Sequence, residues 1–454
     1  MFDSIQMFTL ISVLLVLVFS GVHIAVSLGL TSMLGIYLMT GQIDTVLSFS
    51  SNTAYEALRD YIFAVIPLFM LMGEFLSRSG SATDLFALMN KALKRIPGRL
   101  GVATVLANAV FAFITGVSIA AAAAFSKIAY PEMRRHGYER KFSLGCISGS
   151  ACLGMLIPPS VLMIVWGVIT EMSIGSLFIA GIVPGLLVVV LFIAYIIWVA
   201  IRQPERVGEG AVLPESQQLA RDANDMLEDK DMTALVRSTL GLLFLIVLVL
   251  GGIWLGFFTP TEGAGVGATL ALILALLRGM KLSEMYTAIL SVGRTAAPLL
   301  LLLVAAQLYS RVLAMTGVTG ATKEFFLSSG LPPFVILGLM VLVWFILGCI
   351  IDSISIILLT VPVFAPLAMA LGFDPLAFAI IGILAIETGL LTPPFGILVF
   401  TVKAAIPDEK DLKPSEIFWG AIPFWFVLLA TIVLVAIFPQ IASWLPNVGN
   451  EFAR

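Results

Sequence analysis

Apolar stretches of membrane-spanning length recur from one end of this chain to the other. Backbone polar groups inside a bilayer must be hydrogen-bonded within the protein, so such stretches form helices or closed barrels. A helix needs about 20 apolar residues to cross, and a strand only about 10. The observed lengths therefore predict an all-α integral membrane protein. The stretches lie at 5–24, 25–41, 61–77, 100–131, 142–170, 175–201, 239–258, 262–278, 288–315, 334–365, 376–403 and 417–445.

The composition agrees with a chain that lives in lipid. Charged residues make up 12% of the 454 residues, whereas a soluble domain carries about 25%. The formal net charge of -3 gives no reason to expect a nucleic-acid partner. The sequence contains no nucleotide-binding loop, nucleophile motif or metal-ligand spacing. We therefore expect neither an enzyme nor a resident cofactor.

One polar segment interrupts the apolar pattern near the middle of the chain. Residues 202–237 are rich in Pro, Glu, Asp, Gln and Arg. We interpret this segment as a cytoplasmic linker between two halves, 1–201 and 238–454.

The two halves look like copies of one another. A shift of 235 positions brings special residues into register over about forty positions without a gap, which is difficult to explain by chance in so apolar a chain. We therefore infer an internal duplication. Under this shift Ser118 aligns with Ser353, Pro131 with Pro366, Gly137 with Gly372, Gly154 with Gly389, and Pro158-Pro159 with Pro393-Pro394.

The distribution of basic residues predicts the orientation of each copy. Lys and Arg flank 100–131 on both sides, so both of its ends should be cytoplasmic. Since it is too short for two crossings, we expect a re-entrant hairpin that turns near 115–118. The stretch 334–365 has no basic flank and should enter from the opposite face. Each half would then hold five crossings and one hairpin, about ten crossings in all, which inverts the second copy.

The same count predicts that several basic residues are cytoplasmic. It puts Arg278, Lys281, Arg294 and Lys403 in the cytoplasm, together with the 202–237 linker.

A Pro-Pro pair lies inside each of the stretches 142–170 and 376–403. Proline removes a backbone donor and frees carbonyl groups from the helical ladder. Lipid cannot satisfy these carbonyls, so such a break is tolerated beside protein, water or an ion. Inverted repeats with broken helices are typical of secondary transporters, which bind their solutes near the repeat interface. The alternative interpretation is that each pair is only a packing kink.

The hairpin turns carry the other candidate ligands. Gly116 and Ser118 lie in the first turn, and Gly348, Asp352 and Ser353 in the second. Sodium prefers oxygen ligands, which hydroxyls, a carboxylate and unwound carbonyls all supply. A carboxylate at mid-membrane is costly and usually functional, although Asp352 could also be a satisfied structural acid. Glu387, two residues before Gly389, could face the same cavity.

Six segments give the chain a close resemblance to a known family. The segments are IPLFMLMGEFLSRSG (66–80), PEMRRHGY (131–138), GMLIPPSVLMIVWG (154–167), FIAGIVPG (178–185), FTPTEGAGVGA (258–268) and GLLTPPFG (389–396). With these segments the chain resembles the large membrane subunit of tripartite ATP-independent periplasmic (TRAP) transporters over essentially its whole length.

The resemblance implies a specific function. It implies a sodium-coupled permease of the bacterial inner membrane that imports a small organic acid by an elevator motion. The partners implied are a periplasmic substrate-binding protein and a small membrane subunit, which we expect as a separate chain. The family places its sodium sites at the hairpin turns and adjoining breaks.

These sites can be carried over to residues of this chain. The first hairpin turn departs from the family pattern, because Val117 replaces a hydroxyl residue. We expect the solute to contact Ser118, Ser160, Asp352 and Thr392. We expect sodium ligands among Gly116, Ser118, Ile157, Pro158, Ser160, Gly348, Asp352, Ser353, Gly389, Thr392 and Pro393.

Two other functions stay open on the sequence alone. The same architecture would suit a stand-alone ion-coupled transporter of organic anions, which needs neither partner. A membrane enzyme or a structural subunit is the third reading, and the lack of a catalytic constellation disfavours it.

Overall fold

The computed structural model describes residues 4–208 and 232–452 of the chain, and these residues are helical almost throughout. In these two ranges the only β-type pairing is an isolated bridge between Tyr138 and Val207. Eight of the described helices are long and apolar enough to cross a membrane. The chain is therefore a multi-pass, all-α membrane protein. Most of the predicted linker, residues 209–231, lies outside the described residues.

The first half begins with α1 (Ser4–Phe19), α2 (Ile24–Thr40), α3 (Ile43–Arg59), α4 (Val65–Arg78) and α5 (Ser81–Ala92). It continues with α6 (Arg99–Thr115), α7 (Ser118–Arg135), α8 (Arg140–Ala151), α9 (Leu153–Leu156), α10 (Val161–Thr170) and α11 (Ile174–Arg202). The second half begins with α13 (Met232–Trp254), α14 (Pro260–Leu277), α15 (Leu282–Thr316) and α16 (Val318–Ser328). It ends with α17 (Pro333–Gly348), α18 (Ser353–Ala370), α19 (Pro375–Gly389), α20 (Ile397–Ala405), α21 (Pro414–Ile437) and α22 (Gln440–Phe452).

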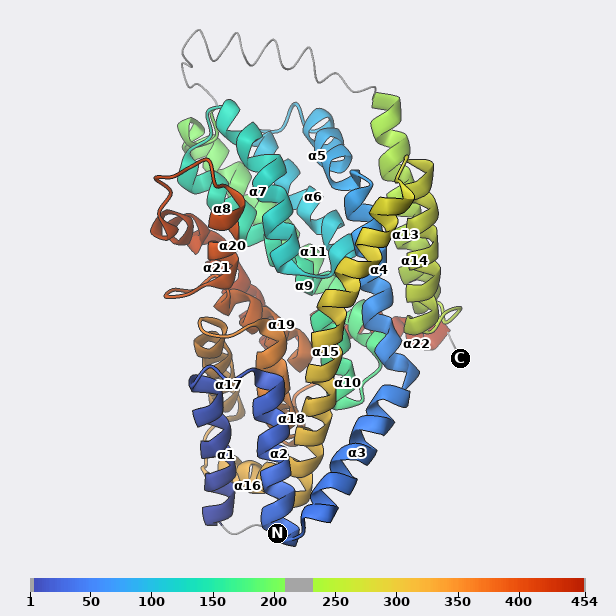
Figure 1. Cartoon of the computed structure of the whole chain (residues 1–454). Helices are drawn as coiled ribbons and strands as arrows, with labels where there is room; N and C mark the ends of the chain where they lie inside the picture. Colours follow the sequence, from blue (N-terminus) through green and yellow to red (C-terminus); the bar gives the residue numbers. More distant parts are fainter. Residues whose placement is uncertain (1–3, 209–231, 453–454) are drawn as a thin grey trace.

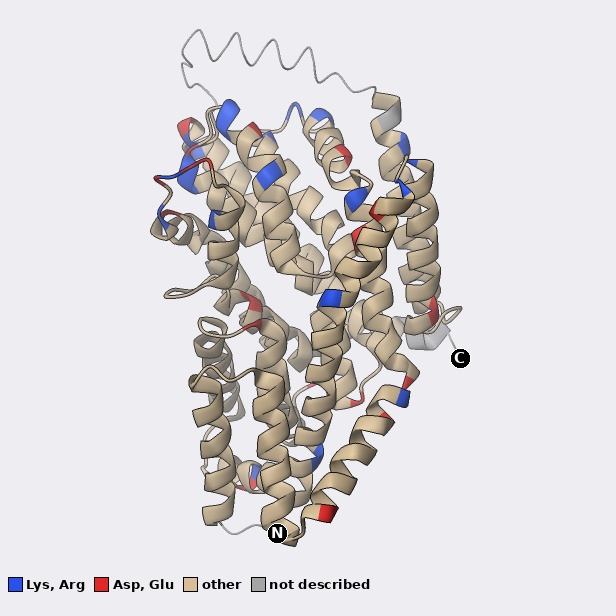
Figure 2. Ribbon diagram, viewed as in Figure 1, with Lys and Arg blue, Asp and Glu red and all other residues tan. Residues whose placement is uncertain are grey.

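Two helical hairpins approach the middle of the molecule from opposite ends. Figure 1 shows α6 and α7 in the upper half and α17 and α18 in the lower half. Lys and Arg gather at the upper end (Figure 2), the end that carries the first hairpin. This arrangement is what an inverted repeat produces, because the second copy of each element points the opposite way.

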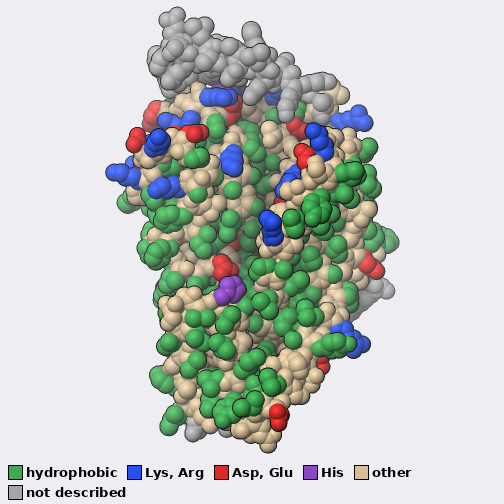
Figure 3. Space-filling model, in the orientation of Figure 1, with side chains coloured by type: hydrophobic (Ala, Val, Ile, Leu, Met, Phe, Trp, Pro, Cys, Tyr) green, Lys and Arg blue, Asp and Glu red, His purple; other side chains and the backbone are tan. Residues whose placement is uncertain are grey.

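A framework of long helices stands beside the hairpins. In it α14 packs along α4, and α15 packs along α2 and α4. The two hairpins and the broken helices α8–α10 and α19–α20 form a second group, which we call the hairpin region; within it α7 contacts α8 and α20, and α10 contacts α18. Hydrophobic side chains cover much of the outer surface below the basic upper rim (Figure 3), as expected for a face in contact with lipid.

The core of the hairpin region joins the two repeats through aromatic side chains. Trp166 of α10 and Trp344 of α17 are fully buried, and their ring centroids lie 6.1 Å apart. The indole Nε1 of Trp344 donates to Thr360 Oγ1 at 2.8 Å, so its polar atom is satisfied. Gly382 makes room for the pair, because a Cβ at this position would lie 2.6 Å from the Trp166 ring.

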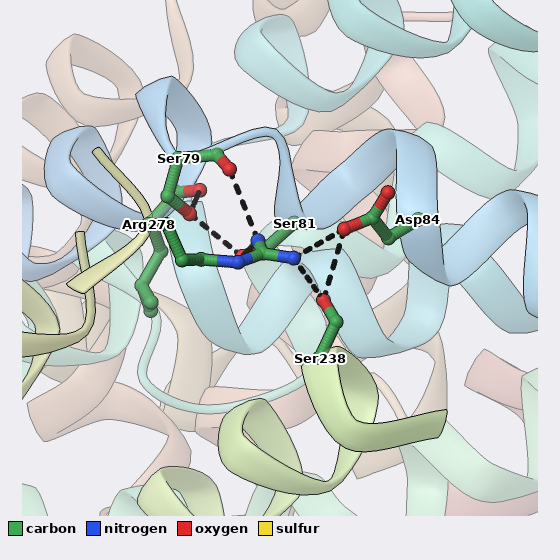
Figure 4. Close-up of polar contacts among 6 residues, drawn as sticks. Ser79, Ser81, Asp84, Ser238 and Arg278 are labelled. Atoms are coloured by element: carbon green, nitrogen blue, oxygen red, sulfur yellow. Dashed lines mark hydrogen bonds and ion pairs between the residues drawn. The ribbon is translucent and has the colours of Figure 1, made fainter. Parts of the chain in front are cut away.

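Arg278 fixes the framework at its basic end. It directly follows α14, and its guanidinium donates to the Ser79 carbonyl at 3.0 Å and to Ser81 Oγ at 2.8 Å. It also bonds Asp84 of α5 and Ser238 of α13, and Ser238 donates to Asp84 at 3.0 Å (Figure 4). One arginine thereby ties α14, α5 and α13 together.

The structure also contains features that the apolar stretches did not predict. The helices α3, α5 and α16 fall between the predicted stretches, and α22 begins inside the last stretch and extends beyond it. Helix α15 is 35 residues long. Arg294, which the charge count placed in the cytoplasm, lies inside α15, about 18 Å along the axis from its first residue.

Candidate solute and ion site

The first hairpin turn is built against the first helix break. Helix α6 ends at Thr115, and Gly116 adopts a left-handed conformation with φ 60°. A Cβ on Gly116 would lie 2.5 Å from the carbonyl oxygen of Pro159. The Gly116 carbonyl accepts a hydrogen bond from the Val161 backbone at 3.2 Å. Glycine is therefore required both for the turn and for its direct contact with the break.

The first break is completely buried. It lies between α9 and α10, and each residue from 151 to 160 is buried, including the expected ligands Ile157 and Pro158. Ser160 begins α10 as its N-cap: its Oγ donates to the Met155 carbonyl at 2.5 Å and accepts from Met163 at 3.4 Å. Helix α11 covers this break, with Gly185 so close to Ile157 that a Cβ would lie 2.8 Å away.

The second hairpin turn presents a carboxylate. Asp352 is the N-cap of α18, and it accepts from Ser355 N at 3.0 Å and from Ser355 Oγ at 2.6 Å. Its side chain is exposed and makes no ion pair within the described residues. Gly348 and Gly389 let α17 and α19 touch, because a Cβ on Gly348 would lie 2.8 Å from the Gly389 Cα.

The second break is more open than the first. Thr392 Oγ1 donates to the Thr388 carbonyl at 2.9 Å and accepts from Trp425 Nε1 at 2.9 Å. Pro393, Pro394 and Phe395 are exposed. The Pro-Pro peptide bond is cis in both breaks.

A single buried carboxylate joins the two hairpin turns. Glu387 of α19 is 1% exposed. It accepts a hydrogen bond from Ser118 Oγ of the first turn and one from Ser353 Oγ of the second turn, the latter at 3.1 Å. These serines are equivalent in the two repeats, since they are 235 positions apart. Their convergence on one carboxylate brings the corresponding turns of both repeats together.

The repeat partner of Glu387 lies beside it. The 235-residue shift aligns Cys152 with Glu387, and the Cys152 thiol lies 3.7 Å from the Glu387 backbone carbonyl. The sequence suggested that Glu387 could face the solute cavity. Instead the structure buries it between the hairpin turns, a location that depends on the contact between repeats and carries no sequence signal beyond an acidic residue in an apolar stretch.

Glu387 has no cationic partner in the described part of the chain. Within the described residues its side chain accepts from the two serine hydroxyls and its backbone carbonyl from the cysteine thiol. These residues contain no cluster of three His, Cys, Asp or Glu side chains for a metal. A buried carboxylate is costly unless a proton or a cation balances its charge. Because both serines donate their protons to Glu387, their oxygen lone pairs stay available to a cation.

A cavity of about 530 Å³ opens between the hairpin turns and the framework. Of the four expected solute contacts, Asp352 lines it, whereas Ser118 and Ser160 are fully buried nearby. Thr392 lies at the second break against Trp425. The lining on the framework side includes His23, Thr295 and Pro298, which the sequence did not single out as site residues.

Comparison with known proteins identifies the family. A sequence profile described as "Tripartite ATP-independent periplasmic transporter, DctM component" matches residues 11–441. The chain belongs to this family of TRAP transporter large permease subunits.

The permease is also similar to individual relatives over nearly its full length. It is 35% identical over 425 residues to the C4-dicarboxylate TRAP transporter large permease protein DctM of Pseudomonas aeruginosa, covering 93% of this chain and 94% of that one. It is 30% identical over 451 residues to the ectoine TRAP transporter large permease protein TeaC of Halomonas elongata, covering 98% and 99%.

A solved structure supports the fold alone. The crystal structure of the YdaH transporter of Alcanivorax borkumensis superposes with a TM-score of 0.58 at 14% identity, covering 89% of this chain and 88% of that one. The profile match and the similar relatives confirm the sequence resemblance to TRAP large permeases.

Proposed function

We propose that this permease imports a small organic acid across the bacterial inner membrane in symport with sodium. The observation that carries the sodium coupling is Glu387, a buried carboxylate that holds one hydroxyl from each hairpin turn and lacks a cationic partner in the described residues. A sodium ion beside these hydroxyls would supply the missing positive charge. Binding of the ion would then hold the two turns together, which couples the ion to the state of the solute cavity.

The remaining expected ligands provide oxygen donors close to each turn. At the first break they are the buried Ser160 and the carbonyls of Ile157 and Pro158, with Gly116 in the adjoining turn. At the second they are Asp352, Thr392 and the carbonyls of Gly389 and Pro393, with Gly348 packed against Gly389. Neutral oxygens with one or two carboxylates suit a monovalent hard cation.

An elevator motion fits the division of the molecule into framework and hairpin region. Asp352 and Val117 of the hairpin region line the same cavity as His23 and Thr295 of the framework. If the hairpin region slides along the framework, the cavity opens to one side of the membrane and then to the other. The relatives are named as TRAP permeases, so we propose that a periplasmic binding protein delivers the acid and that a separate small membrane subunit completes the transporter.

The sodium site can be tested before the solute is known. A ligand that binds only the folded protein raises its stability by RT ln(1 + [L]/Kd). The melting temperature of the detergent-solubilised permease should therefore be higher in sodium chloride than in potassium chloride at equal ionic strength. Identical melting curves across a wide range of concentrations would rule out the proposed site.

Uptake into proteoliposomes tests the rest of the proposal. The permease and its small subunit are reconstituted with an inward sodium gradient, and uptake of labelled succinate and labelled ectoine is measured with and without the binding protein. Uptake that requires both sodium and the binding protein supports the proposal. Uptake by the permease alone would support the stand-alone carrier instead.

A further inference from the structure

The solute cavity has two chemically different walls. One wall comes from the hairpin turns, with Val117, Asp352 and Ser353. The opposite wall comes from the framework, with the α1–α2 loop at 21–24 and one face of α15. The volume of about 530 Å³ lies within the range of small-molecule sites, about 300–1,000 Å³.

The framework wall presents an imidazole to the cavity. His23 is the N-cap of α2, and its Nδ1 accepts from the Ala25 backbone at 3.3 Å. A neutral imidazole that accepts at Nδ1 carries its proton on Nε2. The His23 side chain is exposed and lines the cavity, and no bond from Nε2 is found within the described residues. This wall therefore offers a free hydrogen-bond donor.

Arg294 is next to residues of the same wall along α15, although it is not itself a lining residue. It directly precedes the cavity-lining Thr295 and lies one helical turn before Pro298, which also lines the cavity, so it borders that face of α15. Its side chain is exposed and has no hydrogen bond or ion pair in the residues that the structure describes. An unpaired arginine well inside a long apolar helix is costly, and by default it indicates a functional site.

We propose that His23 and Arg294 form a carboxylate-binding subsite on the framework wall of the cavity. The solute's carboxylate lies toward these two side chains, and its apolar part lies against Leu299 and Leu302. Asp352 lines the opposite wall, where the proposed function assigns it to the sodium ion. The proposal rests on the proposed function, since it names the part of the solute that each wall holds.

The subsite has a mechanical consequence. The solute touches the framework through its carboxylate and the hairpin region through its other end. Any sliding of the hairpin region along the framework must break the contacts with His23 and Arg294. The solute is therefore bound more tightly in the arrangement seen here than after the movement, and this difference in affinity favours release.

Chemical modification of His23 tests the subsite directly. The chain has two histidines, and the other, His136, is buried and hydrogen-bonded to the Glu132 carbonyl. In a His136→Gln background, carbethoxylation by diethyl pyrocarbonate is followed by mass spectrometry of the peptide containing His23. Succinate or ectoine, whichever the reconstituted transporter takes up, should slow the modification about tenfold at saturation; the matching uncharged ester or amide should not.

Transport kinetics give an independent test. His23→Asn keeps a helix N-cap but is too short to reach the solute, and Arg294→Gln removes the charge. Each variant should raise KM about tenfold, equivalent to about 1.4 kcal/mol, with kcat nearly unchanged. Arg311→Gln is the control, because Arg311 lies on α15 like Arg294 but is paired with Glu56.

The possible outcomes separate this proposal from the proposed function. If sodium-driven uptake is intact, but both variants keep the wild-type KM and the transported acid leaves His23 modification unchanged, the subsite is wrong and the symport proposal stands. If uptake does not depend on sodium, the symport proposal fails; protection of His23 by an acid would then still support the subsite.

Discussion

The two repeats contain the same parts, but their sites differ in how they are enclosed. In the first, the turn at Gly116 and the break at Ile157–Ser160 are packed against each other and covered by α11. In the second, Asp352 faces the cavity and Pro393 to Phe395 are exposed. The predicted duplication accounts for the parts that the two halves share, whereas the surroundings of each half leave the first site buried and the second accessible. The two sites are in contact through Glu387, which accepts hydrogen bonds from Ser118 and Ser353.

Removing the shared carboxylate should have the largest effect on sodium binding. Glu387→Gln removes the negative charge of the carboxylate that accepts hydrogen bonds from both serines. The affinity for sodium should therefore fall about 100-fold, which corresponds to a loss of about 2.7 kcal/mol in binding free energy. Sodium-dependent melting temperature is the measurement, and Glu324→Gln, an exposed glutamate of α16, is the control. An unchanged sodium response in Glu387→Gln would mean that the two turns do not share one ion-linked carboxylate.

Sodium-dependent uptake should depend on the negative charge of the accessible second site more than on its helix cap. Asparagine caps helices as well as aspartate does, so the Asp352→Asn variant should fold normally. The sodium concentration that gives half-maximal uptake should shift about tenfold. Asp374→Asn is a matched control, because Asp374 caps the next helix, α19, through Ala377 at 2.8 Å. Equal kinetics for the two variants would remove Asp352 from the site.

The stability of the buried first site should instead depend on its packing. Gly116→Ala must place a Cβ in contact with Pro159 at a positive φ, so we expect a loss of about 2–4 kcal/mol in stability. Gly41→Ala has a similar φ of 68° with nothing near the added Cβ, and it should lose only about 1 kcal/mol. Comparison of the melting temperatures isolates the contribution of the turn-to-break contact; equal losses would show that this contact is unimportant.

The smallest effect is expected at the open second break. Trp425→Phe removes the one side-chain donor to Thr392, which should cost about 0.5–1.5 kcal/mol. Trp419→Phe, at an exposed position on the same helix, serves as the control. A larger loss for Trp425→Phe than for Gly116→Ala would reverse the ranking of the two breaks and contradict the comparison.

Sequence patterns predicted the helices, turns and breaks well, but they did not predict which of these elements contact one another. Apolar length predicted the helical membrane fold, because lipid allows a chain of this kind few alternatives, and six motifs predicted the family. The turns and breaks could be located because Gly, Ser and Pro-Pro leave a local signature. The sodium ligands, the elevator motion and the partners stay predictions.

The tertiary structure alone decided which of these residues meet. Glu387 bonds Ser118 although the two are 269 residues apart in the chain, and His23 shares a cavity with Asp352 across the framework boundary. Arg294, which we predicted to be cytoplasmic, lies within the 35-residue helix α15, directly before the cavity-lining Thr295. Local patterns determine where a helix begins, turns or breaks, whereas the packing of distant helices determines what faces the solute.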